Sequence, residues 1–264
     1  MRISLIGAGR VAHHLAHVLS QQHQIIQIYS RTFISAQTLA AQVHASAVVD
    51  LVDMDASVDL VIMAVSDQAI AGLITQLHAY LPNTLIVHTS GSTDINILAE
   101  QHHRAGVFYP LQTFSLNRDI AWSDTPIFIE AMSEQDTQLL LQLAHQLTTR
   151  VYTYSSAQRL SLHLAAVFAC NFSNYCYDMA QQIVDAQQVD FSLLYPLILE
   201  TAQKALQNPP RLMQTGPAMR GDQNILNRHQ QMLEDAEQNH LKHVYALLSQ
   251  QILQVHSEKA KTES

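Results

Sequence analysis

The chain has 264 residues, 48% of them hydrophobic, which is enough for one large or two modest domains with buried cores. Its formal net charge of −8 at pH 7 argues against a general role in binding nucleic acid or a membrane surface. The fifteen histidines are scattered without the spacing of a zinc site, so no metal is expected.

Near the start of the chain, a short apolar run leads into a glycine-rich turn. Ile3-Ser4-Leu5-Ile6 predicts a buried parallel strand, and Gly7 to Ala12 follows with the pattern G-x-G-x-x-A. Gly7 permits a tight turn, Gly9 lets the backbone approach a pyrophosphate, and Ala12 keeps the next helix close to the sheet. The free N–H groups of that helix would face the phosphate. The residues expected to bind the cofactor here are Gly7, Ala8, Gly9, Arg10 and Val11.

A second predicted strand, Gln24 to Tyr29, completes the βαβ unit and ends in Ser30-Arg31. NAD-binding folds usually carry Asp or Glu at this place for the ribose 2′-hydroxyl. A hydroxyl and a guanidinium favour a 2′-phosphate instead, so Ser30 and Arg31 predict NADP as the cofactor. The alternative is a structural glycine turn with a solvated arginine beyond it.

The following segments alternate regularly between helix and strand up to about residue 154. Helices are predicted at 33–43, 67–80, 94–103 and 134–148, and strands at 47–49, 58–65, 85–87, 107–109, 127–129 and 151–154. This alternation predicts an α/β fold of the Rossmann type, with a doubly wound, mainly parallel sheet and helices on both faces.

Two of these strands end beside the expected cofactor. The strand at 58–65 leads into Ser66-Asp67, and His88-Thr89-Ser90-Gly91-Ser92 follows the strand at 85–87. The carboxyl ends of parallel strands lie at the same edge of a sheet, where ligands bind. The nicotinamide is therefore expected over Ala64, Val65, Ser66, Ser90 and Gly91.

Beyond residue 155 the strand pattern stops, and helices are predicted at 157–187, at 191–206 and at 224–255 with a break near the middle. We therefore expect a Rossmann dinucleotide-binding domain at 1–155 and a helical substrate or dimerisation domain at 156–264. Cys170 and Cys176 are expected inside one helix, at a spacing that prevents a mutual disulfide, as reduced core residues of a cytoplasmic protein. The start of the chain has no signal-peptide pattern, and the longest apolar run is far shorter than a membrane span.

The helix at 157–187 is apolar nearly all round, which predicts burial within this chain or in a dimer. At about 100° per residue, its polar exceptions His163, Asn171, Asn174 and Asp178 fall on one stripe. Buried polar groups need partners, so the stripe is either a core network that fixes helix packing or the lining of a cleft. In a cleft, His163 would suit proton transfer, because histidine ordinarily titrates near neutral pH.

The segment Thr215 to Asp222, TGPAMRGD, is also conspicuous. Its Arg220 has two interpretations. The side chain would bind a substrate carboxylate or the cofactor phosphates, or it would pair with Asp222 and order a loop.

Five motifs in this chain resemble an uncharacterised bacterial family that joins a Rossmann-like NADP-binding domain to a C-terminal helical domain of unknown function. The motifs are Gly7 to Ala12, His88 to Ser92, Tyr109 to Phe114, His163 to Phe172 and Thr215 to Asp222. The resemblance covers essentially the whole chain. It implies an NADP-dependent oxidoreductase of the wider group that contains pyrroline-5-carboxylate reductase, ketopantoate reductase and the 6-phosphogluconate dehydrogenase-like β-hydroxyacid dehydrogenases.

The same resemblance indicates candidate catalytic residues. The wider group often carries a Lys and an Asn on the first helix after the Rossmann domain, and His163 and Asn171 stand nearest those places here. The family usually has His before Pro-Leu-Gln-Thr, where this chain has Tyr109.

The predicted function is hydride transfer between NADP and a small carbonyl, imine or hydroxy compound. His163 would exchange the proton, Asn171 and Thr113 would orient the substrate oxygen, and Arg220 would hold an anionic tail. The alternative is an NADP-binding sensor or regulatory protein without turnover. In either case, a homodimer through the helical domain is expected.

Overall fold

The computed structural model describes residues 1–262, and the chain folds as two compact units. The first unit is Met1–Phe172, and the second begins at Ser173. The first unit therefore includes the helical segment 156–172, which the sequence boundary near residue 155 assigns to the second domain. Within residues 1–262, no helix combines the length and hydropathy that a membrane crossing requires.

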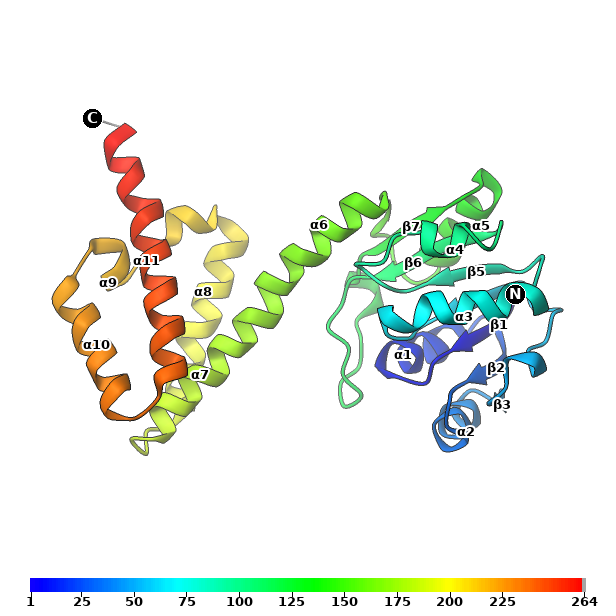
Figure 1. Ribbon diagram of the computed structural model, residues 1–264, viewed down its shortest axis with the longest axis horizontal. Helices are drawn as coiled ribbons and strands as arrows, with labels where there is room; N and C mark the ends of the chain where they lie inside the picture. The colour runs from blue at the N-terminus through cyan, green and yellow to red at the C-terminus, as the bar shows by residue number, and fades with distance from the viewer. Residues whose placement is uncertain (263–264) are drawn as a thin grey trace. The chain divides into compact units, whose positions relative to one another are not determined.

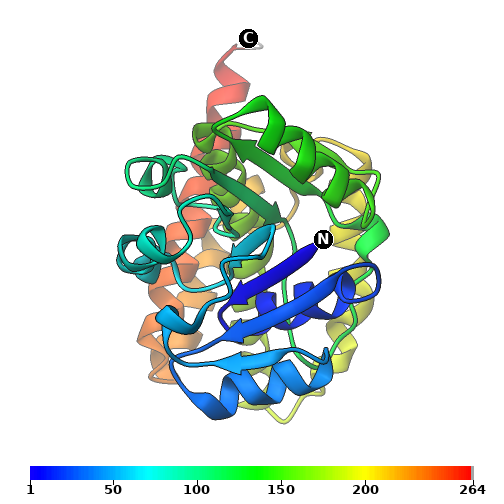
Figure 2. The same ribbon diagram turned by 90° about the vertical axis from the view of Figure 1, so that its right-hand side faces the viewer.

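The first unit is built on an eight-stranded sheet in the order β3-β2-β1-β4-β5-β6-β7-β8. Figure 1 labels β1, β2, β3, β5, β6 and β7. Figure 2 shows these strands side by side. All neighbours pair parallel except β6 and β7, which pair antiparallel, so the expected Rossmann-type, mainly parallel sheet is confirmed. The strands are β1 Arg2–Ile6, β2 Gln24–Tyr29, β3 Ser46–Val48, β4 Leu60–Met63, β5 Leu85–His88, β6 Ala105–Pro110, β7 Ile127–Ala131 and β8 Val151–Thr153.

Helices cover both faces of the sheet because the side chains of its central strands alternate between two buried clusters. In β4, Leu60 and Ile62 pack with the helices of one face, whereas Val61 and Met63 pack with those of the other. The helices of the first face are α1 Arg10–Leu19, α2 Phe33–Gln42 and α5 Glu134–His145, and those of the second are α3 Asp67–Tyr80 and α4 Asn96–Ala99. The helix predicted at 94–103 is thus reduced to the short α4.

The strand order reverses between β1 and β4, where the chain passes from β1 into α1 and from β4 into α3. Because α1 and α3 cover opposite faces, the carboxyl ends of these two strands are left open to a ligand. The fold therefore positions a site at the end that carries the glycine-rich turn.

The segment after the sheet differs from its prediction. The helix α6, Ser156–Ala166, continues into a π-helical segment, Val167–Phe172, and then into α7, Ser173–Asp185. This chain alone does not bury the helix, since Leu164 is 57% and Phe168 63% exposed, so the other half of the expectation, burial in a dimer, stays a prediction. Cys170 and Cys176 are free, as predicted, but both are exposed and belong to no core.

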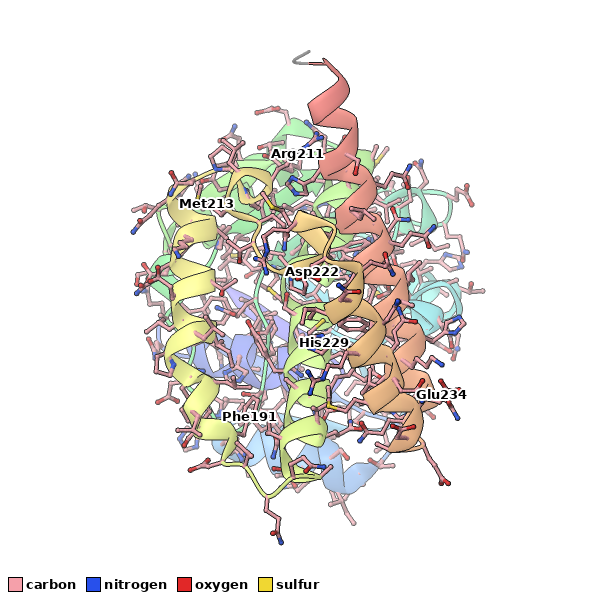
Figure 3. The ribbon with its side chains drawn as sticks, turned by 90° about the vertical axis from the view of Figure 1, so that its left-hand side faces the viewer. Phe191, Arg211, Met213, Asp222, His229 and Glu234 are labelled. Atoms are coloured by element: carbon pink, nitrogen blue, oxygen red, sulfur yellow. The ribbon has the colours of Figure 1, made fainter. Side chains whose placement is uncertain are left out.

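The second unit is helical, as expected. Its remaining helices are α8 Tyr195–Gln207, α9 Pro217–Arg220, α10 Gln223–Asp235 and α11 Asn239–Thr262. The break predicted within 224–255 lies between α10 and α11, where Glu237 has a φ of 57°. Figure 3 shows Asp222, whose side chain caps α10 by accepting from the Ile225 N–H, and His229, whose Nδ1 lies 2.9 Å from the Tyr245 hydroxyl of α11.

Candidate functional site

The turn between β1 and α1 requires glycine at its first position. Gly7 has a φ of 112°, and a Cβ there would lie 2.2 Å from the carbonyl oxygen of Ala64 at the end of β4. The Gly7 N–H donates to the carbonyl of Tyr29, 2.8 Å away, at the end of β2. The turn is therefore pressed between the ends of two strands, in a conformation that only glycine adopts without strain.

The second glycine of the turn faces open space. Gly9 precedes α1, and a Cβ built on it meets no atom within 4 Å. The helix begins without a side-chain cap and without an acidic residue in its first turn. Its first N–H groups are thus available to an anion, which fits the pyrophosphate of a dinucleotide.

A cleft of about 870 Å³ opens at this edge of the sheet. It brings together all twelve residues that the sequence assigns to the cofactor: Gly7, Ala8, Gly9, Arg10, Val11, Ser30, Arg31, Ala64, Val65, Ser66, Ser90 and Gly91. Its volume is that of a pocket for a sizeable organic ligand.

The charges of the cleft favour phosphate groups. Among the residues that line it, Arg10 and Arg31 carry guanidinium groups, and Asp67 carries the only carboxylate. Asp67 accepts a hydrogen bond from the Ser92 hydroxyl. The end of β2 offers Ser30 and Arg31, with no acid for a ribose 2′-hydroxyl.

The loop after β5 is fixed by its own hydrogen bonds. The Ser90 hydroxyl oxygen accepts from the N–H groups of Ser92 and Thr93, at 3.1 and 2.9 Å. The Ser90 N–H donates to Nδ1 of His88, which is fully buried. Burial lowers the pKa of His88 to about 3, so its ring is neutral and shapes the loop rather than exchanging protons near neutral pH.

Arg159 anchors this loop to the rest of the unit. Its guanidinium, 1% exposed, pairs with the Glu130 carboxylate of β7 and donates to the carbonyls of Ser90 and Thr93 and to the Ser156 hydroxyl. Arg159 was not predicted from the sequence, although it is a charged residue one helical turn before His163. Arg159 and His163 are four residues apart and lie on the same face of α6. The contacts of Arg159 therefore fix that face against the loop.

Tyr109 and His163 meet above Gly91. The Tyr109 hydroxyl lies 3.2 Å from Nδ1 of His163. A Cβ on Gly91 would lie 2.7 Å from that same nitrogen and 2.7 Å from the Tyr109 ring, so the glycine makes room for the pair. Burial raises the pKa of Tyr109 to about 12, which keeps its phenol protonated and able to donate to the imidazole.

A second pocket of about 480 Å³ shares Tyr109, Gln112 and His163 with the cleft. Two more predicted catalytic residues, Thr113 and Asn171, line it. Three of the four candidates are thus brought together in the first unit. Arg220 ends α9 in the second unit, so its expected contact with the substrate stays a prediction.

The predicted stripe of four polar residues is wrong as a description of one helix face. A step of 100° per residue assumes an α-helix throughout, and the π-helical segment 167–172 interrupts it between His163 and Asn174. His163 and Asn171 nevertheless line the same pocket. Asp178 accepts from Gln182 on α7, one turn further along.

Family models match both halves of the chain. A Rossmann-like domain matches residues 1–112, and a domain of unknown function, DUF2520, matches residues 125–252. No match was found among curated proteins.

Solved structures match the chain over nearly its whole length. A Bacteroides fragilis protein that is named as a proposed NADP oxidoreductase is 40% identical to this chain, with a TM-score of 0.88. The match covers 96% of this chain and 98% of the B. fragilis chain. An imine reductase from Myxococcus stipitatus in complex with NADP⁺ is 14% identical over 99% of this chain and 95% of its own, with a TM-score of 0.68. A pyrroline-5-carboxylate reductase from Coxiella burnetii is 14% identical over 97% of both chains, with a TM-score of 0.57. These last two similarities show a shared fold.

Proposed function

The chain belongs to the family that joins a Rossmann-like domain to a DUF2520 domain, and we propose that it is an NADP-dependent oxidoreductase. The observation that carries the proposal is the cleft, where a glycine-rich turn, an uncapped helix and two guanidinium groups face one space beside a tyrosine–histidine pair. The reaction proposed is hydride transfer between the nicotinamide and a small carbonyl, imine or hydroxy compound. The names of the B. fragilis and M. stipitatus proteins support the same class of activity.

The residues of the cleft fit NADP. The turn from Gly7 to Val11 would hold the pyrophosphate, because Gly9 leaves the backbone accessible and α1 directs its N–H groups outward. Arg31 would pair with the 2′-phosphate through a charge-assisted hydrogen bond, and the Ser30 hydroxyl would donate to it. The ends of β4 and β5 would line the nicotinamide end.

Bound NADP(H) supplies or accepts the hydride. The chain must then move a proton to or from the heteroatom of the substrate, and His163 is the residue proposed for that step. Its Nδ1 lies within hydrogen-bond distance of the Tyr109 hydroxyl, so in reduction a doubly protonated His163 would give its Nε2 proton to the substrate heteroatom while its Nδ1–H donates to the Tyr109 oxygen. Tyr109 would thus hold the neutral ring in the tautomer protonated at Nδ1, whose free Nε2 accepts the proton in the oxidative direction, and Thr113 and Asn171 would orient the substrate oxygen or nitrogen.

The first experiment is a titration of the purified chain with NADPH and with NADH, followed by nicotinamide fluorescence. We expect NADPH to bind at least about tenfold tighter, a difference of about 1.4 kcal/mol. Arg31→Ala should erase this preference by weakening NADPH alone. Arg118→Ala, which removes an exposed arginine outside the cleft, should leave both affinities unchanged. If neither nucleotide binds, the proposal is refuted.

A sensor without turnover is the second candidate, because the chain has no lysine before Lys204 to act as the proton donor expected on this helix. A panel of carbonyl and imine compounds, tested for NADPH oxidation, separates the two. An oxidoreductase should consume NADPH with at least one compound, and His163→Ala should abolish this while leaving NADPH affinity intact. Tight NADPH binding without any turnover would favour the sensor.

A further inference from the structure

The second pocket has the size and position of a substrate site. It holds about 480 Å³, within the range of pockets for small organic molecules. Tyr109 and His163 belong to its wall and to the wall of the cofactor cleft. A molecule in this pocket would therefore reach the pair proposed to move the proton.

The π-helical segment builds one side of the pocket. Val167, Ala169, Cys170 and Asn171 all come from it. Segments of this kind are rare and are frequent at functional sites. The segment follows directly on α6, so the side of the pocket that it forms is held to His163 by a continuous helix.

The lining of the pocket carries no permanently charged side chain. Half of its residues are Leu, Val and Ala, and the other half are Tyr109, Gln112, Thr113, His163, Cys170 and Asn171, which offer hydrogen bonds. Burial keeps the Tyr109 phenol neutral, since its pKa is raised to about 12. A ligand here would meet apolar surface and hydrogen-bonding side chains, but no Asp, Glu, Lys or Arg.

Two charged groups that interact electrostatically with Tyr109 already have partners. These are Arg159 and Asp67. Arg159 is paired with Glu130, and Asp67 accepts from the Ser92 hydroxyl. A carboxylate or phosphate in the pocket would find no arginine of the first unit on its wall to pair with, which disfavours an anionic ligand.

We propose that this pocket binds the substrate, and that the substrate is a small carbonyl or imine compound with an uncharged, mostly apolar body. The inference rests on the proposed function and narrows its substrate class. Thr113 and Asn171 supply hydrogen bonds to the heteroatom, and the alanines of the wall leave room for an apolar ring.

The test compares two ligands that differ in one charge, 4-oxocyclohexane-1-carboxylate and its methyl ester. Their affinities for the NADP⁺-saturated chain are measured by ligand-observed NMR. The ester should bind at least about tenfold tighter than the acid. Ala166→Phe, which fills the pocket, should lower the affinity for the ester by about tenfold or more while the affinity for NADPH stays unchanged. Ala157→Phe, on the same helix but exposed and outside both pockets, should alter neither.

Three outcomes would overturn the inference. The first is that the acid binds as tightly as the ester. The second is that Ala166→Phe leaves the affinity for the ester unchanged. The third is that the ester does not bind to a chain that does bind NADPH. If the acid binds tightly and Arg220→Ala removes that binding, the second unit supplies the cation and the substrate is anionic. Failure of NADPH to bind refutes the proposed function instead, and the two ligands are then compared on the chain without nucleotide.

Discussion

Arg159 and Glu130 form an ion pair in which the arginine side chain is 1% and the glutamate side chain 18% exposed. The carboxylate also accepts from the N–H and hydroxyl of Ser156, so the start of α6 is tied to β7 at two residues. The same guanidinium holds two carbonyls of the loop after β5. One buried cation thus joins the strand, the loop and the helix that together position His163.

Replacement of Arg159 by Met should lower the free energy of unfolding of the first unit by about 3–5 kcal/mol, because it leaves the partly buried Glu130 without its countercharge. The double variant Arg159→Met/Glu130→Leu should be more stable than Arg159→Met alone, since it removes the unpaired charge. Urea unfolding followed by the fluorescence of Trp122, the only tryptophan, measures this unit specifically. Arg118→Ala should change stability by less than about 0.5 kcal/mol. Equal losses from the single and double variants would contradict the argument.

Gly7 and Gly9 should respond differently to alanine. Gly7→Ala places a Cβ 2.2 Å from the Ala64 carbonyl at a φ of 112°, so the loss of stability should be of order 3 kcal/mol. Gly9→Ala meets no neighbour and should change stability by less than about 0.5 kcal/mol. The Gly9 variant should instead bind NADPH more weakly, by about tenfold or more, because its methyl group would stand where the pyrophosphate approaches. Unfolding curves and NADPH titrations of both variants distinguish the two effects, and a Gly9→Ala chain that binds NADPH normally would contradict this role.

The cofactor cleft could be predicted because its signals are local. The glycines, the strand ends and Ser30-Arg31 each follow an apolar strand directly, and parallel pairing brings the carboxyl ends of such strands together. The alternation of apolar segments predicted the fold class for the same reason. The antiparallel β7 could not be told from a parallel strand, because a buried strand has the same composition in either direction.

The pairing of Tyr109 with His163 could be predicted only in part. His163 was found as a polar exception on an apolar helix, but its partner Tyr109 lies 54 residues away, and no periodicity relates the two. The π-helical segment has no recognised sequence signal, so the angular positions beyond residue 166 were wrong. An apolar helix also predicts burial, but its sequence does not identify the surface that packs against it. Leu164 and Phe168 of this helix are exposed on the single chain.

His88 should make stability depend on pH. In the folded chain its pKa is lowered to about 3, whereas the unfolded chain takes up the proton below 6.5. The neutral ring therefore contributes fully to the free energy of unfolding above pH 6.5. This contribution is lost as the pH falls toward 3, because the unfolded state then binds more protons than the folded state. His88→Asn keeps an acceptor for the Ser90 N–H and removes this titration. Between pH 7.5 and 5 the wild type should lose roughly 2 kcal/mol relative to the variant. Urea unfolding at several pH values measures the difference, and parallel stability curves for the two chains would rule it out.

The helical unit should mediate association of two copies. Tyr195, Leu199 and Leu206 share one face of α8, at spacings of four and seven residues; they are 59%, 59% and 87% exposed, and α8 has no buried residue. Large apolar side chains gathered on one exposed element are typical of an interaction surface, because their contact with water is unfavourable. We therefore expect a homodimer in light scattering. The double variant Leu199→Glu/Leu206→Glu should raise the dimer dissociation constant by about tenfold or more, because it places charges in the apolar contact. Gln203→Glu adds the same charge on this helix without removing an apolar group, so its effect should be smaller. A wild-type chain that stays monomeric at micromolar concentration would contradict this expectation, and the exposed leucines of α8 would then require another partner.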